Sequence, residues 1–196
     1  MTEISRETAA DLVEYATVSM AFVVREIVDV EATLATMDEF VVRRVDRPYV
    51  KDYDAIDGNR PTDWPLRFDV SEWGFFTAAQ AGVRVGGAVV ARATPGLDML
   101  EGRRDFAVLW DIRVAPPARR HGVGSALFDA AAAWAASQGC RELKVETQDV
   151  NVAACRFYAR QGCVLRSIRR GAYSLCPEEH QLLWYKRLRP VDVHPV

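Results

Sequence analysis

A glycine-containing turn between an apolar strand and an alanine-rich helix is the feature that most constrains the fold of this chain. The apolar run Ala107–Val114 predicts the strand, Arg119–Gly124 forms the turn, and residues 125–138 predict the helix. A glycine turn that opens a helix directs several backbone N–H groups at one point, where the helix N-terminus adds partial positive charge. The two arginines of the turn add cationic donors beside it. The segment therefore predicts a site for a phosphate group, such as that of a phosphate-bearing cofactor.

The rest of the chain predicts a mixed α/β domain, in which antiparallel strands precede a strand–helix–strand–helix–strand order. In the first part we expect a lead-in helix or arm (1–20), a strand (22–30), a helical turn (31–37) or a short strand (40–42), and a proline-containing loop (46–69). Further on we expect a hairpin (73–79 and 84–92), a helix (152–161), and strands 143–147, 163–167 and 181–188. The helical stripe Leu127, Ala131 and Trp134, with Ala130 alongside, predicts packing against the sheet.

Length and charge limit the class of protein. A chain of 196 residues fits one domain with a sizeable core. The formal net charge of -2 gives no reason to expect nucleic acid or an anionic membrane as a partner. No apolar run approaches the roughly 20 residues that span a bilayer. The first residues lack the order of a signal peptide, so a cytoplasmic location is the default expectation.

The cysteines and histidines do not form a metal-binding pattern. The four cysteines are Cys140, Cys155, Cys163 and Cys176, and the three histidines are His121, His180 and His194. None of the cysteines forms a Cys-x-x-Cys pair, and the histidines have no ligand spacing to them. We therefore expect no metal site, and reduced, buried thiols at Cys155 and Cys163.

Two motifs in this order resemble the GCN5-related N-acetyltransferase superfamily. The first is a strand followed by an Arg-x-x-Gly-x-Gly loop, here Asp111–Gly124, and the second is an Asn, a Phe-Tyr pair and a Gly, here Asn151–Gly162. The resemblance covers roughly residues 73–168. It implies a mixed, mostly antiparallel central sheet, flanked by helices and splayed at the strands that admit acetyl-CoA.

The resemblance also implies one acetyltransferase domain over residues 1–196. Residues 1–72 would be its variable, acceptor-side half, residues 73–168 its acetyl-CoA-binding core, and residues 169–196 its C-terminal strand region. Acetyl-CoA would be the co-substrate, with no metal. In the family the loop N–H groups hold the pyrophosphate, the strand backbone pairs with the pantetheine arm, and the Asn side chain reaches that region. The residues implied here are Ile112, Arg113, Val114, Arg119, Arg120, His121, Gly122, Val123, Gly124, Ser125, Asn151, Ala154 and Tyr158.

Tyr158 is the candidate general acid. An aliphatic amine, with a pKa near ~10, must lose a proton before it attacks a thioester, and the departing thiolate gains from a nearby acid. Tyr158 follows Asn151 by two helical turns on the same face, so it could lie beside the sulfur. The family pattern favours this role. The alternative for Tyr158 is a half-buried core aromatic.

The general base is left open by the sequence. Many relatives have Glu directly before the Asp of the strand, where this chain has Trp110. Strand alternation would send Asp111 to the face opposite Trp110 and Ile112. Glu146, Asp111 or a water relay could accept the proton, and either carboxylate could instead be structural. Backbone N–H groups around Ile112–Val114 would polarise the thioester.

A narrower resemblance concerns the acceptor. Glu146–Tyr158, Ala172–Pro177 and Leu183–Tyr185 resemble streptothricin acetyltransferases, and Pro48–Tyr53 is similar to their N-terminal half. Those enzymes acetylate an amine of an antibiotic, which implies a small-molecule amine acceptor and a role in antibiotic resistance. The alternatives are a protein lysine or N-terminal acetyltransferase and a non-catalytic acyl-CoA-binding module. Dimers are frequent in the family, which leaves a homodimer open.

Segment 44–72 is the candidate for shaping the acceptor site. It holds more acids than bases, which suits either a pocket for a cationic substrate or a solvated surface. Trp64 and Trp73 are candidates for a pocket wall or for plain core.

Overall fold

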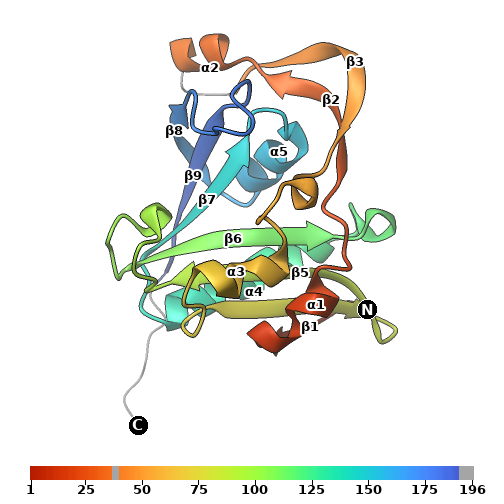
Figure 1. Ribbon diagram of the computed structural model, residues 1–196, viewed down its shortest axis with the longest axis vertical. Coiled ribbons are helices and arrows are strands. Elements are labelled where there is room, and N and C mark those ends of the chain that lie inside the picture. Colours follow the sequence, from red (N-terminus) through yellow and green to blue (C-terminus); the bar gives the residue numbers. More distant parts are fainter. Residues whose placement is uncertain (37–39, 190–196) are drawn as a thin grey trace. The chain divides into compact units, whose positions relative to one another are not determined.

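The computed structural model describes residues 1–36 and 40–189 (Figure 1). The chain forms two compact units. The first unit contains Met1–Met20, Asp52–Lys144 and the chain from Arg187, and the second contains Ala21–Lys51 and Val145–Lys186. The chain therefore passes between the units at 20/21, 51/52, 144/145 and 186/187. Met37, the end of the expected helical turn, and His194 lie outside the described residues.

Antiparallel strands form the sheet of the first unit. Their order is β1 (Glu3–Glu7), β4 (Gly74–Gln80), β5 (Val83–Arg92) and β6 (Phe106–Val114), followed by the first residues of β7 (Glu142–Gln148). The hairpin of β4 and β5 confirms the sequence prediction. The expectation of a helix or arm is wrong for β1, which pairs from Glu3↔Ala79 to Glu7↔Phe75. The strand is polar and largely exposed, so it lacks the apolar alternation by which strands are recognised.

Helices cover both faces of this sheet. Helix α4 (Val123–Ser137) packs against β4, β5 and β6, whereas the short helices α1 (Leu12–Tyr15) and α3 (Trp64–Arg67) lie on the other face (Figure 1). Two neighbouring glycines of β5 allow the helices to pack closely. A Cβ atom at Gly86 would lie 3.2 Å from Leu127 of α4, and one at Gly87 would overlap the ring of Tyr15. Because successive strand residues face opposite sides, the two glycines admit a different helix on each face.

The second unit contains the rest of β7 and two further strands that follow it in the order β9 (Gln181–Arg187) and β8 (Val164–Arg169). Helix α5 (Val152–Arg160) packs against β8 and against β2 (Phe22–Val28). Strand β2 pairs antiparallel with β3 (Val42–Lys51) as a separate ribbon, and α2 (Val30–Thr36) connects the two strands (Figure 1). The buried side chains include Leu182, Leu183 and Trp184, whose Nε1 donates to Thr147 Oγ1 (2.9 Å).

The fold is a mixed α/β arrangement with mostly antiparallel strands flanked by helices, as the sequence predicts. The strands expected at 107–114, 143–147, 163–167 and 181–188 and the helices expected at 125–138 and 152–161 are present with small shifts at their ends. The loop expected over 46–69 is wrong in part, because β3 continues to Lys51 and α3 begins at Trp64. Within the described residues, no helix combines the length and apolar character needed to cross a membrane.

Candidate functional site

The turn before α4 ends in a helix N-terminus that no side chain caps. Arg120 and Gly122 both adopt the left-handed backbone conformation, with φ of 66° and 82°, and the helix begins at Val123. The first hydrogen bond inside the helix runs from the Ala126 N–H to the Gly122 carbonyl (3.0 Å). The N–H groups of the first turn therefore have no acceptor inside the helix. Together with the helix dipole, they favour binding of an anion.

Arg119 braces this turn against β6. Its Nε donates to the Val114 carbonyl (2.8 Å) and its Nη2 to the Ser19 carbonyl (3.3 Å). Burial lowers the pKa of Arg119. Arg120 and His121, by contrast, are exposed. The two arginines that the sequence places together thus differ in surroundings, and Arg120 is the one whose side chain reaches solvent.

Close to this turn in the chain, backbone groups at the end of β6 point away from β5. The Ala115 N–H donates to the Val85 carbonyl (2.8 Å), and Arg113 pairs with Gly87. In an antiparallel pair, successive residues direct their backbone groups alternately toward and away from the partner strand. Ile112 and Val114 therefore direct theirs away from β5. The contact between Arg119 and the Val114 carbonyl agrees with this direction.

Asp111 and Arg113 belong to a buried ion-pair network. The Arg113 side chain is 0% exposed and donates to Asp111 through Nε–Oδ1 (3.0 Å) and Nη2–Oδ2 (2.7 Å). It also donates to Asp54 through Nη1–Oδ2 (2.8 Å) and Nη2–Oδ1 (3.2 Å). The Tyr15 hydroxyl donates to Asp111 Oδ1 (2.6 Å). Burial alone would lower the pKa of Arg113, but the Asp111 carboxylate outweighs it and the pKa is raised.

A β-bulge at Trp110 changes the direction of side chains in β6. Val89 pairs with Asp111 and Val90 with Leu109, so Trp110 is the extra residue. The Trp110 ring lies 6.4 Å from that of Trp64, which in turn lies 6.0 Å from the Tyr15 ring that bonds Asp111. Trp110 and Asp111 thus both contact the layer formed by α1 and α3. The expectation that they face opposite sides is wrong, because a bulge interrupts strand alternation.

The tryptophans considered for the acceptor site lie in the core of the first unit. Trp64 and Trp73 are buried, and their rings lie 6.5 Å apart. The Trp73 ring also lies 5.4 Å from Trp110 and 6.0 Å from Phe68. Trp73 Nε1 donates to Thr94 Oγ1 (2.7 Å), which satisfies its polar end. These contacts support the core alternative.

Helix α5 carries Asn151 and Tyr158 in the second unit. Asn151 is the N-cap residue, and its Oδ1 accepts a hydrogen bond from the Ala154 N–H (3.1 Å). Tyr158 lies two turns further along, is 5% exposed, and contacts the Phe157 ring at 5.2 Å. Its burial is compatible with both alternatives that the sequence leaves open.

Glu146 on β7 is held by neutral side chains. Its Oε1 accepts from the Tyr173 hydroxyl (2.8 Å) and from Gln148 Nε2 (3.4 Å), and its Oε2 accepts from Gln181 Nε2 (2.6 Å). Burial raises the pKa of Tyr173, and the charge of Glu146 adds to this effect. No cation of the described chain pairs with Glu146, in contrast to Asp111 with its arginine.

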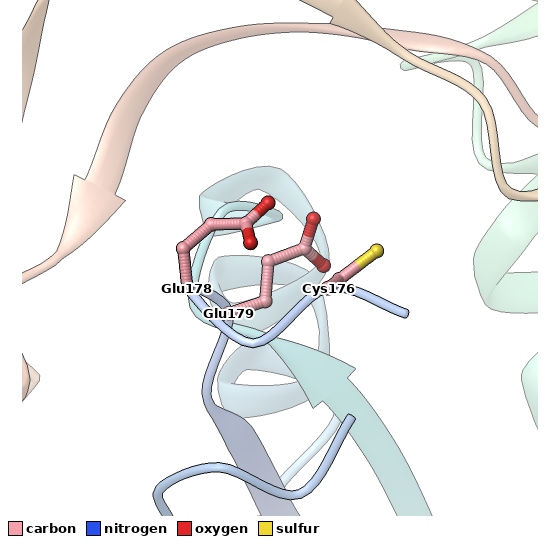
Figure 2. Close-up of side chains that lie close together, drawn as sticks. All are labelled: Cys176, Glu178 and Glu179. Atoms are coloured by element: carbon pink, nitrogen blue, oxygen red, sulfur yellow. The ribbon is translucent and has the colours of Figure 1, made fainter. Parts of the chain in front are cut away.

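A cluster of possible metal ligands lies in the loop before β9. Cys176, Glu178 and Glu179 offer ligand atoms within 4.8 Å of one another, and Figure 2 shows the three side chains leaving the same loop. Lys51 of β3 forms an ion pair with Glu179, which is 2% exposed, and donates to Cys176 Sγ (3.3 Å). Burial alone would lower the pKa of Lys51, but the hydrogen bonds to Glu179 and Cys176 raise it. The ammonium group thus already compensates the buried acid.

Three of the residues just described were not identified as functional from the sequence. Tyr173 and Gln181 contact Glu146, and Lys51 binds the loop between them. The sequence signals were that Tyr173 and Lys51 lie in segments resembling streptothricin acetyltransferases and that Gln181 is a polar residue opening an apolar strand. Neither signal indicates a contact with β7, because the residues are far apart in the chain.

The chain is similar in sequence to a family model and to curated proteins. The model of the acetyltransferase (GNAT) family matches residues 39–163. Streptothricin acetyltransferase A of Bacillus subtilis (strain 168) is 37% identical over 82 residues, which cover 41% of this chain and 47% of the relative. The chain spans about half the length of the curated relatives that it matches.

Solved structures resemble the chain over nearly its whole length. A crystal structure of nourseothricin acetyltransferase has a TM-score of 0.72 and 25% identity, and the match covers 96% of this chain and 99% of that one. A Bacillus anthracis str. Ames protein, solved in complex with acetyl coenzyme A, has a TM-score of 0.71 and 22% identity, with coverage of 96% and 100%. The second likeness, at this identity, shows the fold alone.

Proposed function

This chain belongs to the acetyltransferase (GNAT) family, and from that membership we propose that it transfers an acetyl group from acetyl-CoA to a primary amine of a small molecule. The observation that carries the proposal is the uncapped N-terminus of α4 behind the left-handed residues Arg120 and Gly122. The relative named streptothricin acetyltransferase and the structural neighbour named nourseothricin acetyltransferase favour an antibiotic of the streptothricin type as acceptor.

Backbone and side-chain groups of the first unit are suited to bind the acetyl donor, acetyl-CoA. In our proposal the N–H groups of Val123 and Gly124 bind its pyrophosphate, with His121 and Arg120 beside them. The backbone groups of Ile112 and Val114 that point away from β5 pair with the amides of its arm. Bound acetyl-CoA supplies the thioester that the amine attacks. We place the reaction in the cytoplasm, with neither nucleic acid nor membrane as a partner.

We assign proton acceptance to Glu146. Its partners are neutral donors, so its negative charge is not neutralised by a cation. Asp111 accepts hydrogen bonds from Tyr15 and Arg113 and is 8% exposed, which suits a structural role. In this proposal, Asp111 holds Arg113 in place, whereas Glu146 takes the proton that the acceptor amine loses.

We assign proton donation to Tyr158. A phenol can protonate a departing thiolate, since its ordinary pKa of ~10 lies near that of the thiol, ~8.5. Its place on α5, two turns after the N-cap Asn151, supports this role only together with the family motif. Asn151 already caps α5 through the Ala154 N–H, so its proposed contact with the donor is an additional one.

The test measures CoA release from acetyl-CoA in the presence of streptothricin. CoA is quantified by chromatography, because Cys176 is a partly exposed thiol that would consume a thiol reagent. We expect acceptor-dependent release by the wild type, and a loss of kcat of about 100-fold or more in Tyr158→Phe and in Glu146→Gln.

Val164→Ala is the control, since Val164 is 59% exposed on β8 and has no assigned role, and we expect it to keep wild-type turnover. Absence of acceptor-dependent CoA release from streptothricin and from a set of simple diamines would remove the proposed function. Unchanged turnover in Tyr158→Phe would remove only the acid role.

A further inference from the structure

We propose that Tyr173, together with Gln181, positions the Glu146 carboxylate for proton acceptance, so that the loop between β8 and β9 is a positioning element of the reaction. The inference rests on the proposed function, in which Glu146 is the proton acceptor. In this proposal, Tyr173 and Gln181 contact neither acetyl-CoA nor the amine substrate. They act through Glu146 alone.

The contacts hold the carboxylate from two sides. Tyr173 donates to Oε1 (2.8 Å) from the loop, and Gln181 donates to Oε2 (2.6 Å) from β9. Gln148 Nε2 donates to the Tyr173 hydroxyl oxygen (3.2 Å), which leaves the hydroxyl proton directed at Glu146. The plane of the carboxylate is therefore set by donors from two different segments of the chain.

The arrangement leaves room for a proton. A carboxylate has about four lone-pair sites. Oε1 accepts two hydrogen bonds, from Tyr173 and Gln148, whereas Oε2 accepts one, from Gln181. One site on Oε2 thus remains for a proton taken from an amine or from a water molecule. The donors fix where this site points, and because they are neutral they leave the charge of Glu146 in place.

Tyr173 is itself held by an anchored loop. Lys51 ties the loop to β3 through Glu179 and Cys176, whose side chains leave the loop as Figure 2 shows. At its end the loop exchanges two hydrogen bonds with Asp149, the residue that follows β7, from His180 N to Asp149 Oδ1 (2.8 Å) and from Asp149 N to the His180 carbonyl (3.0 Å). These contacts give the loop a fixed path past Glu146, as a positioning element requires.

The experiment compares Tyr173→Phe with the control Val164→Ala in the full chain. Loss of a donor to the charged carboxylate makes its proton bind more tightly, so the acidic limb of the kcat/KM profile should move to higher pH by about one unit. We expect kcat near pH 7 to fall about tenfold, with KM for acetyl-CoA unchanged. Val164→Ala should leave the profile where it is. A purely structural role for Tyr173 would lower activity equally at every pH, and that result would overturn the inference.

A second readout does not depend on turnover. The ¹³C resonance of the Glu146 carboxyl carbon, measured without substrates, should move in Tyr173→Phe and stay in place in Val164→Ala. If the wild type releases no CoA, the proposed function fails while this resonance still reports the contact. If turnover is present and the resonance is unmoved, the positioning role fails alone. Gln181→Met, which removes the donor to Oε2, provides the same test should Tyr173→Phe not fold.

Discussion

At the scale of single residues, Arg113 is a buried charge whose removal should strongly lower the free energy of unfolding. It is fully buried and pairs with two carboxylates, Asp111 on its own strand and Asp54 on a 3₁₀ turn of another segment. Replacing it with methionine keeps much of the volume but leaves two partly buried acids without their cation. We expect Arg113→Met to lower the free energy of unfolding by about 3–5 kcal/mol, measured by urea denaturation.

The matched control is Arg170→Met. Arg170 also pairs with a carboxylate, that of Glu31, but both side chains are more than half exposed. Solvent screens such a pair, and we expect a change of roughly 0–1 kcal/mol. Equal effects of the two substitutions would show that the Arg113 network is not the source of stability inferred from its burial.

The proposed roles of Asp111 and Glu146 depend on contacts that the sequence does not reveal. Both are acids within apolar strands, and the sequence left both as candidates for the base. Their difference lies in partners that come from distant segments: Tyr15 for Asp111, and Tyr173 for Glu146. No local pattern encodes such contacts. The turn before α4 could be located, by contrast, because Arg119–Gly124 and its helix are contiguous in the chain.

At the scale of elements, the two ends of α4 permit a controlled test of the donor site. Gly122 and Gly139 both have a positive φ, 82° and 81°, and no atom lies within 4 Å of a Cβ added at either position. Alanine should therefore cost about 1–2 kcal/mol of stability at each end. Only Gly122 belongs to the proposed pyrophosphate site, at the N-terminus of α4.

We accordingly expect Gly122→Ala to weaken binding of CoA by about tenfold or more, and Gly139→Ala to leave it unchanged, as measured by calorimetry. Thermal denaturation of both variants provides the stability comparison. If the two glycines weakened CoA binding equally, the effect would reflect lost stability, and the N-terminus of α4 would lose its assigned role.

Edge strands account for most of the errors in predicting the fold. Strand β3 contains Pro48 and mostly exposed side chains, which are the signals of a loop. It is nevertheless a strand because it pairs with β2 in a two-stranded ribbon, where an edge tolerates proline. Central strands such as β6 are buried and apolar, and their positions could be predicted. Whether a polar segment forms a strand depends on its pairing partner, and the local sequence does not identify that partner.

At the scale of the whole molecule, two buried thiols should make the free energy of unfolding decrease as the pH becomes alkaline. Burial raises the pKa of Cys155 to about 12 and that of Cys163 to about 11, from an ordinary value of 9.0. Between these values the unfolded chain loses protons that the folded chain retains, so unfolding becomes more favourable as pH rises. We expect the free energy of unfolding to fall with pH from about 9 to 11, by about 1 kcal/mol per pH unit for each thiol.

Urea denaturation at several pH values measures this slope, and the double variant Cys155→Ala/Cys163→Ala provides the comparison. The double variant starts from a lower free energy of unfolding, so the comparison uses the change in this free energy per pH unit and not its absolute value. The variant should have the shallower slope, because it lacks the two thiols. Parallel slopes would mean that tyrosine and lysine titration accounts for the whole pH dependence.

The chain passes between its two units four times, and this path limits how the protein can be recombined with its relatives. A chimera with a single crossover cannot exchange one unit intact, because each unit is assembled from separate stretches of the gene. An exchange of the second unit needs both Ala21–Lys51 and Val145–Lys186 from the same parent. Lys51 and Glu179 would otherwise come from different parents, and a buried acid would depend on a lysine selected in another context.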